Sequence, residues 1–102
     1  SKAAAPGPLA LLRGEGAIGT QAGANVVLFA DGDGPLTAAT VKVAAATRRV
    51  VVGDLIAGKA YVVQAGTKRV TADASSAGTI LVADLSLAEG QSIQLSVAKE
   101  SP

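Results

Sequence analysis

The stretch VVVGDLIAGKAYVV, residues 50–63, decides the fold expected for this chain. Three valines run into a Gly-Asp pair, and a second apolar run begins at Tyr61, after Ala57 and Gly58. Valine and tyrosine favour strands, whereas Gly and Asp mark turns. The stretch therefore predicts a strand, a tight corner that begins at Leu55 and closes at Gly58, and a second strand.

Tyr61 is the only tyrosine of the chain and follows this corner directly. In Greek-key sandwiches, a tyrosine placed just after such a corner can bond its hydroxyl to backbone upstream and lock the crossing. We therefore interpret Tyr61 first as a structural residue, and only second as a residue that could bind a ligand.

The composition limits both the core and the chemistry. A chain of 102 residues is the size of one domain, and Phe29 and Tyr61 are its only aromatic residues, so the core must consist of small aliphatic side chains. Cysteine and histidine are absent, which removes disulfides, thiolate chemistry, the usual general base and the commonest metal ligand. The acidic residues fall mostly in turns or beside basic residues, so we expect no enzyme.

The charge balance argues against two classes of partner. Nine basic and eight acidic side chains give a net charge of +1, and the sequence has neither a basic stripe nor an aromatic stacking platform for nucleic acid. Its apolar runs are far shorter than the roughly 20 residues of a membrane helix. We therefore expect no nucleic-acid partner and no membrane span.

The remaining sequence predicts further short strands between turn signals. Beyond the two strands of the corner, we expect strands within residues 9–12, 25–30, 40–43, 68–72, 79–85 and 91–97. Strands separated by turn signals roughly every 8–12 residues are typical of a sandwich or a barrel. We predict an all-β, immunoglobulin- or fibronectin III-like antiparallel sandwich of about seven or eight strands, with a closed barrel as the alternative.

The same pattern sets the domain boundaries. We expect the sandwich to occupy residues 9–98, because turns and strands alternate throughout this range. Residues 1–8, SKAAAPGP, are predicted to be a flexible linker or arm, since their two prolines oppose regular structure. Residues 99–102 are predicted to be a frayed tail. The strands in residues 9–12 and 68–72 are expected to lie at sheet edges.

Two glycine-rich segments have the outline of a ligand site. Residues 14–19, GEGAIG, match the GxGxxG pattern of dinucleotide binding, but no helix follows, so a turn or bulge is predicted there and no cofactor. Asp31 and Asp33 lie among glycines like the opening of a calcium loop, without its later ligands. A plain turn is the main prediction, and a Ca²⁺ site completed by distant residues is the alternative.

Five basic side chains on neighbouring segments are candidate contacts for an anionic ligand. They are Arg48, Arg49, Lys59, Lys68 and Arg69. One interpretation is a solvated charged face, with an arginine stem covering the core edge. The other is a surface that binds an acidic polysaccharide.

Three segments together resemble a known module. NVVLF (25–29), TRRVVVGDLIAGKAYVV (47–63) and ASSAGTILV (74–82) resemble the small C-terminal β-sandwich of secreted bacterial heparinase II/III-like polysaccharide lyases and related exported proteins. The resemblance implies a non-catalytic accessory domain, outside the cell or in its envelope, with a larger parent chain or catalytic domain as partner. It carries over no catalytic residue, and the charges at Arg48, Arg49 and Asp54 depart from the pattern.

Two other functions stay open beside the accessory role. The first is a carbohydrate-binding module for acidic glycans, which would use the basic side chains because Tyr61 is assigned to the corner. The second is a self-assembling structural or adhesin subunit, joined through edge strands or through the N-terminal arm.

Overall fold

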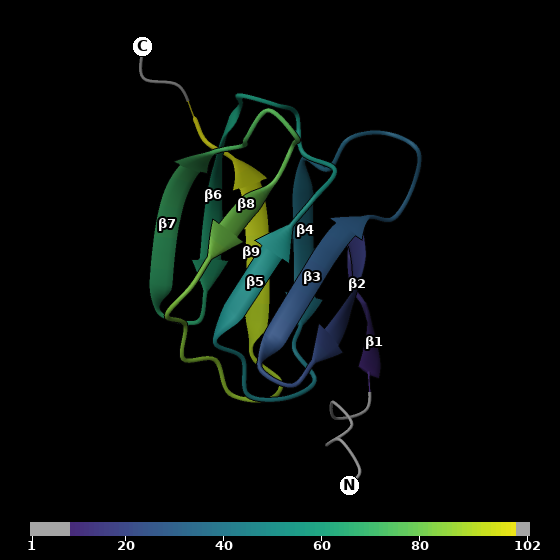
Figure 1. The fold of residues 1–102 in the computed structure, drawn as a ribbon, viewed down its shortest axis with the longest axis vertical. Coiled ribbons are helices and arrows are strands. Elements are labelled where there is room, and N and C mark those ends of the chain that lie inside the picture. Colours follow the sequence, from purple (N-terminus) through teal and green to yellow (C-terminus); the bar gives the residue numbers. More distant parts are fainter. Residues whose placement is uncertain (1–8, 100–102) are drawn as a thin grey trace, which may run out of the picture.

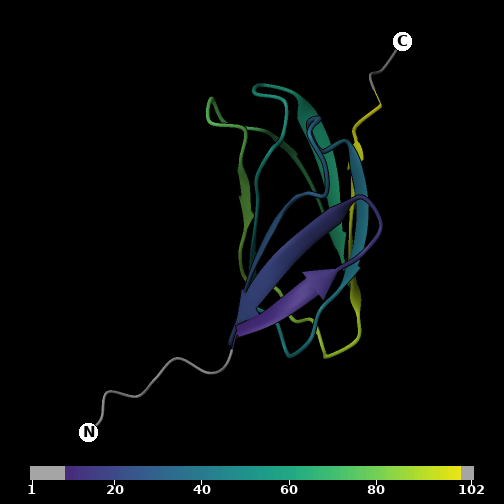
Figure 2. The ribbon, with the colours of Figure 1, turned by 90° about the vertical axis from the view of Figure 1, so that its right-hand side faces the viewer.

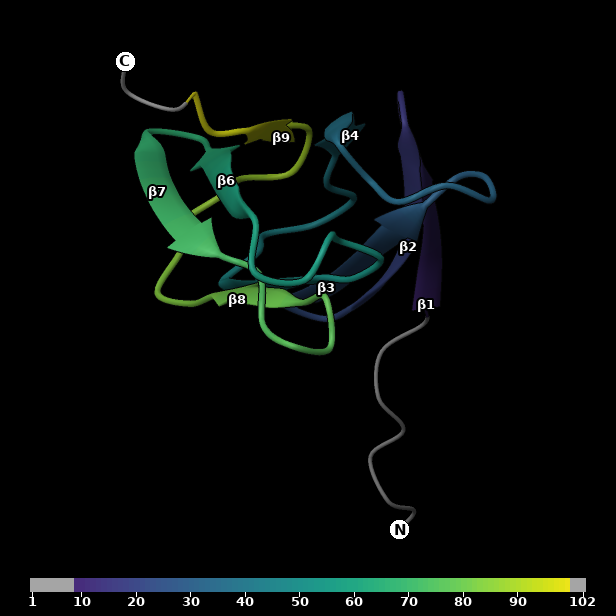
Figure 3. The same cartoon turned by 90° about the horizontal axis from the view of Figure 1, so that it is seen from above.

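The chain folds into a two-layer β-sandwich, which confirms the predicted fold class. The computed structural model describes residues 9–99, and these form nine strands and no helix. Figures 1 and 2 show the two layers from the front and from the side, and Figure 3 shows them end-on. Within the described residues there is accordingly no helix long and apolar enough to cross a membrane. The predicted linker at residues 1–8 and the last three residues of the predicted tail lie outside this range.

One layer is a five-stranded sheet in the order β1-β2-β3-β5-β8. Its strands are β1 (Leu9–Arg13), β2 (Ala17–Ala22), β3 (Asn25–Ala30), β5 (Arg49–Val52) and β8 (Ile80–Val82). The pairs are antiparallel except β3 and β5, which run parallel. A parallel pair needs a long crossover connection, and here the chain between them passes through β4 in the other sheet.

The second layer is a four-stranded antiparallel sheet in the order β4-β9-β6-β7. Its strands are β4 (Ala38–Lys42), β6 (Ala60–Ala65), β7 (Lys68–Asp73) and β9 (Ser92–Val97). As expected from the sequence, β1 and β7 are edge strands; the other two edges are β8 and β4.

The strand count corrects the prediction of seven or eight, because β2 occupies part of the GxGxxG segment. The turn there is confined to residues 14–16, and Gly19 lies inside β2. A Cβ atom at Gly19 would come 2.2 Å from the Val27 carbonyl oxygen of the adjacent strand β3. Glycine within a strand often marks such a close backbone approach, and this is why the segment has the composition of a turn while it forms a strand.

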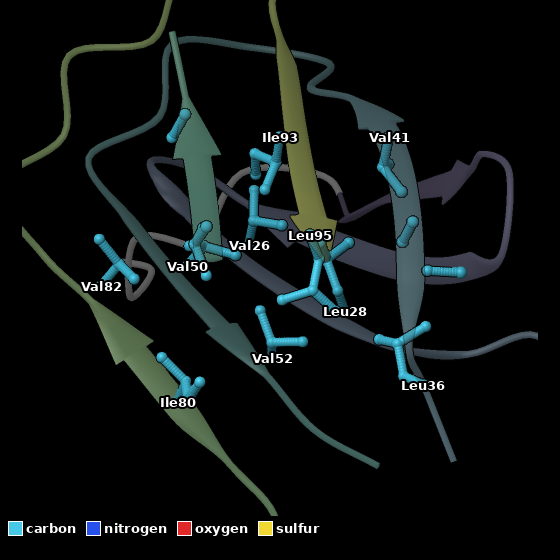
Figure 4. Close-up of a cluster of buried hydrophobic side chains, with 14 of the residues drawn as sticks. Val26, Leu28, Leu36, Val41, Val50, Val52, Ile80, Val82, Ile93 and Leu95 are labelled. Atoms are coloured by element: carbon cyan, nitrogen blue, oxygen red, sulfur yellow. The ribbon is translucent and has the colours of Figure 1, made fainter. Parts of the chain in front are cut away.

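The core consists of aliphatic side chains from both sheets. Figure 4 shows Val26, Leu28, Val50 and Val52 of the five-stranded sheet together with Leu95 of the four-stranded sheet. Tyr61 is the largest side chain that is fully buried. Many modest contacts therefore replace the large aromatic contacts that most cores of this size contain.

The chain passes from the five-stranded to the four-stranded sheet by two similar corners. β5 leads through Asp54 and Leu55 to β6, and β8 leads through Asp84 and Leu85 to β9. Both aspartates are left-handed, with φ of 58° and 59°, and both leucines are buried. Aspartate is one of the few non-glycine residues that tolerate this conformation. The repeated Asp-Leu pairs are thus equivalent corners of the sandwich.

Candidate functional site

The corner in residues 50–63 is held by the hydroxyl group of Tyr61. This hydroxyl donates a hydrogen bond to the Leu36 carbonyl oxygen (3.2 Å) and accepts one from the Ile56 N–H group (2.9 Å). Tyr61 is fully buried, Leu55 is 7% exposed, and Gly58 closes the turn with φ of 77°. The hydroxyl uses one donor and one acceptor position inside the core, so its visible role is structural.

Asp54 strengthens the same corner through its side chain and its backbone. Its carboxylate accepts a hydrogen bond from the Ala30 N–H group (3.0 Å), and its carbonyl accepts one from the Leu36 N–H group (2.7 Å). The end of β5 is thereby tied to the end of β3 and to the β3–β4 connection. The Asp54 carboxylate thus has a local structural role.

A second buried polar cluster joins Gln21 of β2 to the β4–β5 connection. The Gln21 amide accepts from the Ala44 N–H group (2.8 Å) and donates to the Ala45 carbonyl (3.1 Å) and to the Thr47 hydroxyl (2.9 Å). Gln21 and Thr47 are 2% and 1% exposed. Because these groups are bonded to backbone and to each other, they hold the β4–β5 connection against β2.

Three of the five candidate basic side chains gather at one end of the sandwich. Arg48 directly precedes β5 and Arg49 is its first residue, and both line a depression together with Ala83 and Asp84. Lys68 donates a hydrogen bond from its ammonium group to the Ala83 carbonyl (3.1 Å). The β6–β7 turn and the start of β5 are therefore neighbours around the end of β8. This cluster of Arg48, Arg49 and Lys68 is called the basic end below.

The side chains of the other two basic residues do not join the basic end, although Arg69 directly follows Lys68 in the chain. Lys59 precedes β6 at the opposite end of the strands, next to the turn that Gly58 closes. Arg69 lies on the outer face of the four-stranded sheet, beside its cross-strand neighbour Gln64. The structure thus separates the five residues that the sequence analysis grouped.

Asp31 and Asp33 lie in the exposed loop between β3 and β4, visible at the upper right of Figure 1. Asp33 shares a depression with Asp54, whereas Asp31 is not part of its lining. Asp54 already accepts the Ala30 N–H group. In residues 9–99, no group of three or more Asp, Glu, His or Cys residues could hold a metal ion.

The outer faces of the two sheets differ sharply in polarity. Cross-strand partners share one face of a sheet, so the register of the strands gives the rows of side chains. The central outer row of the five-stranded sheet is Leu11–Thr20–Val27–Val51–Leu81. The corresponding row of the four-stranded sheet is Thr40–Gln94–Gln64–Arg69. One face therefore has the chemistry of a solvated surface, and the other is mainly aliphatic.

The aliphatic side chains of this outer face are well exposed. Leu11 is 77%, Leu81 53% and Val27 40% exposed, and Leu9 on the same face is 69% exposed. The charged outward residues of these five strands are Arg13 and Arg49, both basic and both away from the central row. Contiguous exposed apolar surface is typical of interaction sites. The set Leu9, Leu11, Val27, Val51 and Leu81 is called the apolar face below.

Comparison of the chain with known protein families, with curated proteins and with solved structures gave no match.

The sequence analysis missed the apolar face and the Gln21 cluster for one reason. The residues of each set come from strands far apart in the chain and meet only through strand pairing. A local signal did exist for the face: LALLR and VVLF show little of the alternation expected of a strand with one solvated side. That signal marks strands with two apolar sides, but it does not say which strands are neighbours.

Proposed function

We propose that this chain is a non-catalytic accessory β-sandwich domain that packs on a larger protein body. The observation that carries the proposal is the apolar face, because exposed aliphatic rows of this extent favour cover by another protein surface. The basic residues at its margin, Arg13 and Arg49, favour a partner surface with carboxylates at its rim. The two buried polar side chains are engaged in structural bonds, which agrees with a scaffold role.

The setting we propose is an exported bacterial protein, in the extracellular space or the envelope. It rests on the resemblance of residues 25–29, 47–63 and 74–82 to the C-terminal module of heparinase II/III-like lyases. In such an arrangement the larger chain carries out the catalysis, and this domain packs against it as a rigid support.

Activity measurements on the isolated chain test the accessory role. The purified chain is incubated with a panel of acidic and neutral polysaccharides, and new reducing ends and unsaturated products are followed over a day. We expect no turnover above that of heat-denatured protein. Turnover that persists through repurification and scales with the amount of chain would overturn the proposal.

A second function is favoured by the basic end. Arg48 and Arg49 line one depression with Asp84, and Lys68, from a different segment, bonds to the Ala83 carbonyl beside it. Three positive charges therefore lie near one small surface that carries one carboxylate. We propose that this end contacts sulfated or carboxylated glycans as a subsidiary activity of the accessory domain.

Retention on immobilised heparin tests this contact. The variant Arg48→Gln/Arg49→Gln should elute at clearly lower salt than the wild type, because charge contacts are screened by salt. Lys59→Gln/Arg69→Gln loses the same charge elsewhere and serves as the matched control. Equal shifts for both variants would show that net charge alone causes retention, and wild-type flow-through at low salt would discard glycan binding.

A further inference from the structure

Among the described residues, the outer edge of β1 from Leu9 to Arg13 has no partner strand. Within residues 9–99 β1 pairs with β2 alone, and the Gly14 N–H group bonds to the Ala17 carbonyl (3.1 Å) in the turn between them. In an antiparallel ladder, bonded and non-bonded pairs alternate along the strands. The N–H and C=O groups of Leu12 therefore point to β2. Those of Leu9, Leu11 and Arg13 point to the opposite side of the strand.

The other three edges of the sandwich are each protected. The outer edge of β4 is occupied by Glu15, which exchanges two backbone bonds with Thr40 (2.9 and 3.0 Å). β8 is three residues long, and the Lys68 ammonium group bonds to the carbonyl of Ala83 at its end. β7 carries the exposed charges of Lys68, Arg69 and Asp73. Short length, covering and charge are the usual protections of an edge.

Within residues 9–99, the outer side of β1 is unpaired from Leu9 to Arg13, and β4 covers that side only from Glu15 onward, where Glu15 bonds to Thr40. β1 is five residues long and reads LALLR, with one charge at its final position and no proline. Leu9 and Leu11 are also the two most exposed large apolar side chains of the described chain, at 69% and 77%. Unpaired backbone and exposed aliphatic side chains thus coincide on one strand.

We propose that two copies of this chain associate through β1, pairing antiparallel about a two-fold axis at Leu11. In this register Leu11 lies opposite the partner's Leu11, and Leu9 lies opposite the partner's Arg13. All the outward backbone groups of Leu9, Leu11 and Arg13 are then used. The five-stranded sheet becomes a continuous sheet across the two copies, and the apolar face continues from one copy to the other.

Two features favour a second copy over an unrelated extended segment. The partner's β1 is already held straight by its own β2, so pairing avoids much of the ordering cost that a disordered segment would incur. The register also separates like charges. Arg13 and the partner's Arg13 are four residues apart along the strand direction, or about 14 Å at 3.4 Å per residue, and each aliphatic stem lies over a leucine.

The contact is expected to be weak. One strand pair of five residues is about 17 Å long, whereas a stable interface buries about 800 Å² per partner. We therefore expect a dimer in the micromolar to millimolar range, in rapid exchange with the monomer. The inference does not rest on the proposed accessory function, since activity and association are measured separately.

Sedimentation velocity of the 102-residue chain from about 10 µM to 1 mM, the range of a weak dimer, tests the association. The wild type should shift from monomer towards dimer with concentration. Leu11→Lys should remain monomeric, because it places two charges face to face at the axis. Leu81→Lys makes the same change on the same face at the opposite edge, and should dimerise like the wild type. Equal melting temperatures of the three proteins would show that each is folded.

Three results would overturn the proposal. A monomeric wild type at every concentration removes the association. A dimer that survives Leu11→Lys must use another surface. Loss of the dimer in both variants shows that the apolar face itself, rather than the β1 edge, makes the contact.

Single-cysteine variants test the register, because the chain has no cysteine of its own. Bonded antiparallel partners have Cα atoms about 5.5 Å apart, within the range that a disulfide spans. Under mild oxidation, Leu11→Cys should form a covalent dimer much faster than Leu9→Cys, whose residue faces the partner's Arg13. Faster cross-linking of Leu9→Cys would overturn the register centred on Leu11.

Discussion

At the scale of single residues, one hydroxyl group connects three segments of the chain. Tyr61 is the second residue of β6, and its hydroxyl bonds to the backbone of Leu36 and Ile56. The aromatic ring supplies the largest fully buried side chain in a core otherwise built of aliphatic residues. Tyr61, the aromatic side chain that could have stacked on a sugar ring, is therefore buried and hydrogen-bonded within the fold.

Tyr61→Phe should lower the free energy of unfolding by about 1–3 kcal/mol, because the Ile56 N–H and Leu36 carbonyl groups lose a buried partner while the ring remains. Urea unfolding followed by circular dichroism measures the change. Thr71→Val is the matched control: it removes an exposed hydroxyl of β7 and should change stability by no more than about 0.5 kcal/mol. An unchanged midpoint for Tyr61→Phe would contradict the structural role.

At the scale of elements, β2 shows how a strand can have the composition of a turn. Gly14 and Gly19 both lie where a Cβ atom would meet backbone oxygen at about 2 Å, of Thr40 and Val27 respectively. The glycines allow the β1–β2 hairpin to approach β3 and β4. The same hairpin covers the edge of β4 through Glu15, and among the described residues the edge of β1 from Leu9 to Arg13 has no partner strand.

Gly19→Ala should destabilise the chain by about 2 kcal/mol or more, because a methyl group that meets backbone atoms forces the two strands apart. Thermal unfolding of the variant measures the loss. Gly32→Ala is the control, since a Cβ atom there meets nothing within 4 Å. Equal melting temperatures for Gly19→Ala and the wild type would show that β2 and β3 can separate at little cost.

At the scale of the whole molecule, both sheets contribute to one core, and the chain crosses between them repeatedly. The core cluster combines buried residues of the five-stranded sheet, such as Val26 and Val50, with buried residues of the four-stranded sheet, such as Ile93 and Leu95. Neither sheet can keep its inner face buried without the other. The polarity of the two outer faces, by contrast, makes the molecule asymmetric, with one solvated side and one apolar side.

This shared core predicts a single cooperative unfolding transition. Tyr61 is the only tyrosine and there is no tryptophan, so intrinsic fluorescence reports on the core corner alone. Its transition in urea should coincide with that of the far-ultraviolet circular dichroism, which reports on all strands. A fluorescence transition at clearly lower urea would show that the corner opens before the sheets separate.

The sequence alone determined the fold class and most of the strands, because alternation, β-branched residues and turn residues act over short distances. The corner in residues 50–63 was predicted for the same reason, since its glycine, its aspartate and its tyrosine are neighbours in the chain. β2 was not predicted, because the close contact that explains Gly19 involves the following strand and not its own segment.

Only the tertiary structure decided which strands are neighbours. The parallel pairing of β3 with β5 joins segments more than twenty residues apart, and no local signal specifies it. That pairing sets the row from Leu11 to Leu81 on one outer face, and the loop between β6 and β7 brings Lys68 to Arg48 and Arg49. Interaction surfaces of this kind arise from strand order, and strand order depends on how the whole chain buries its core.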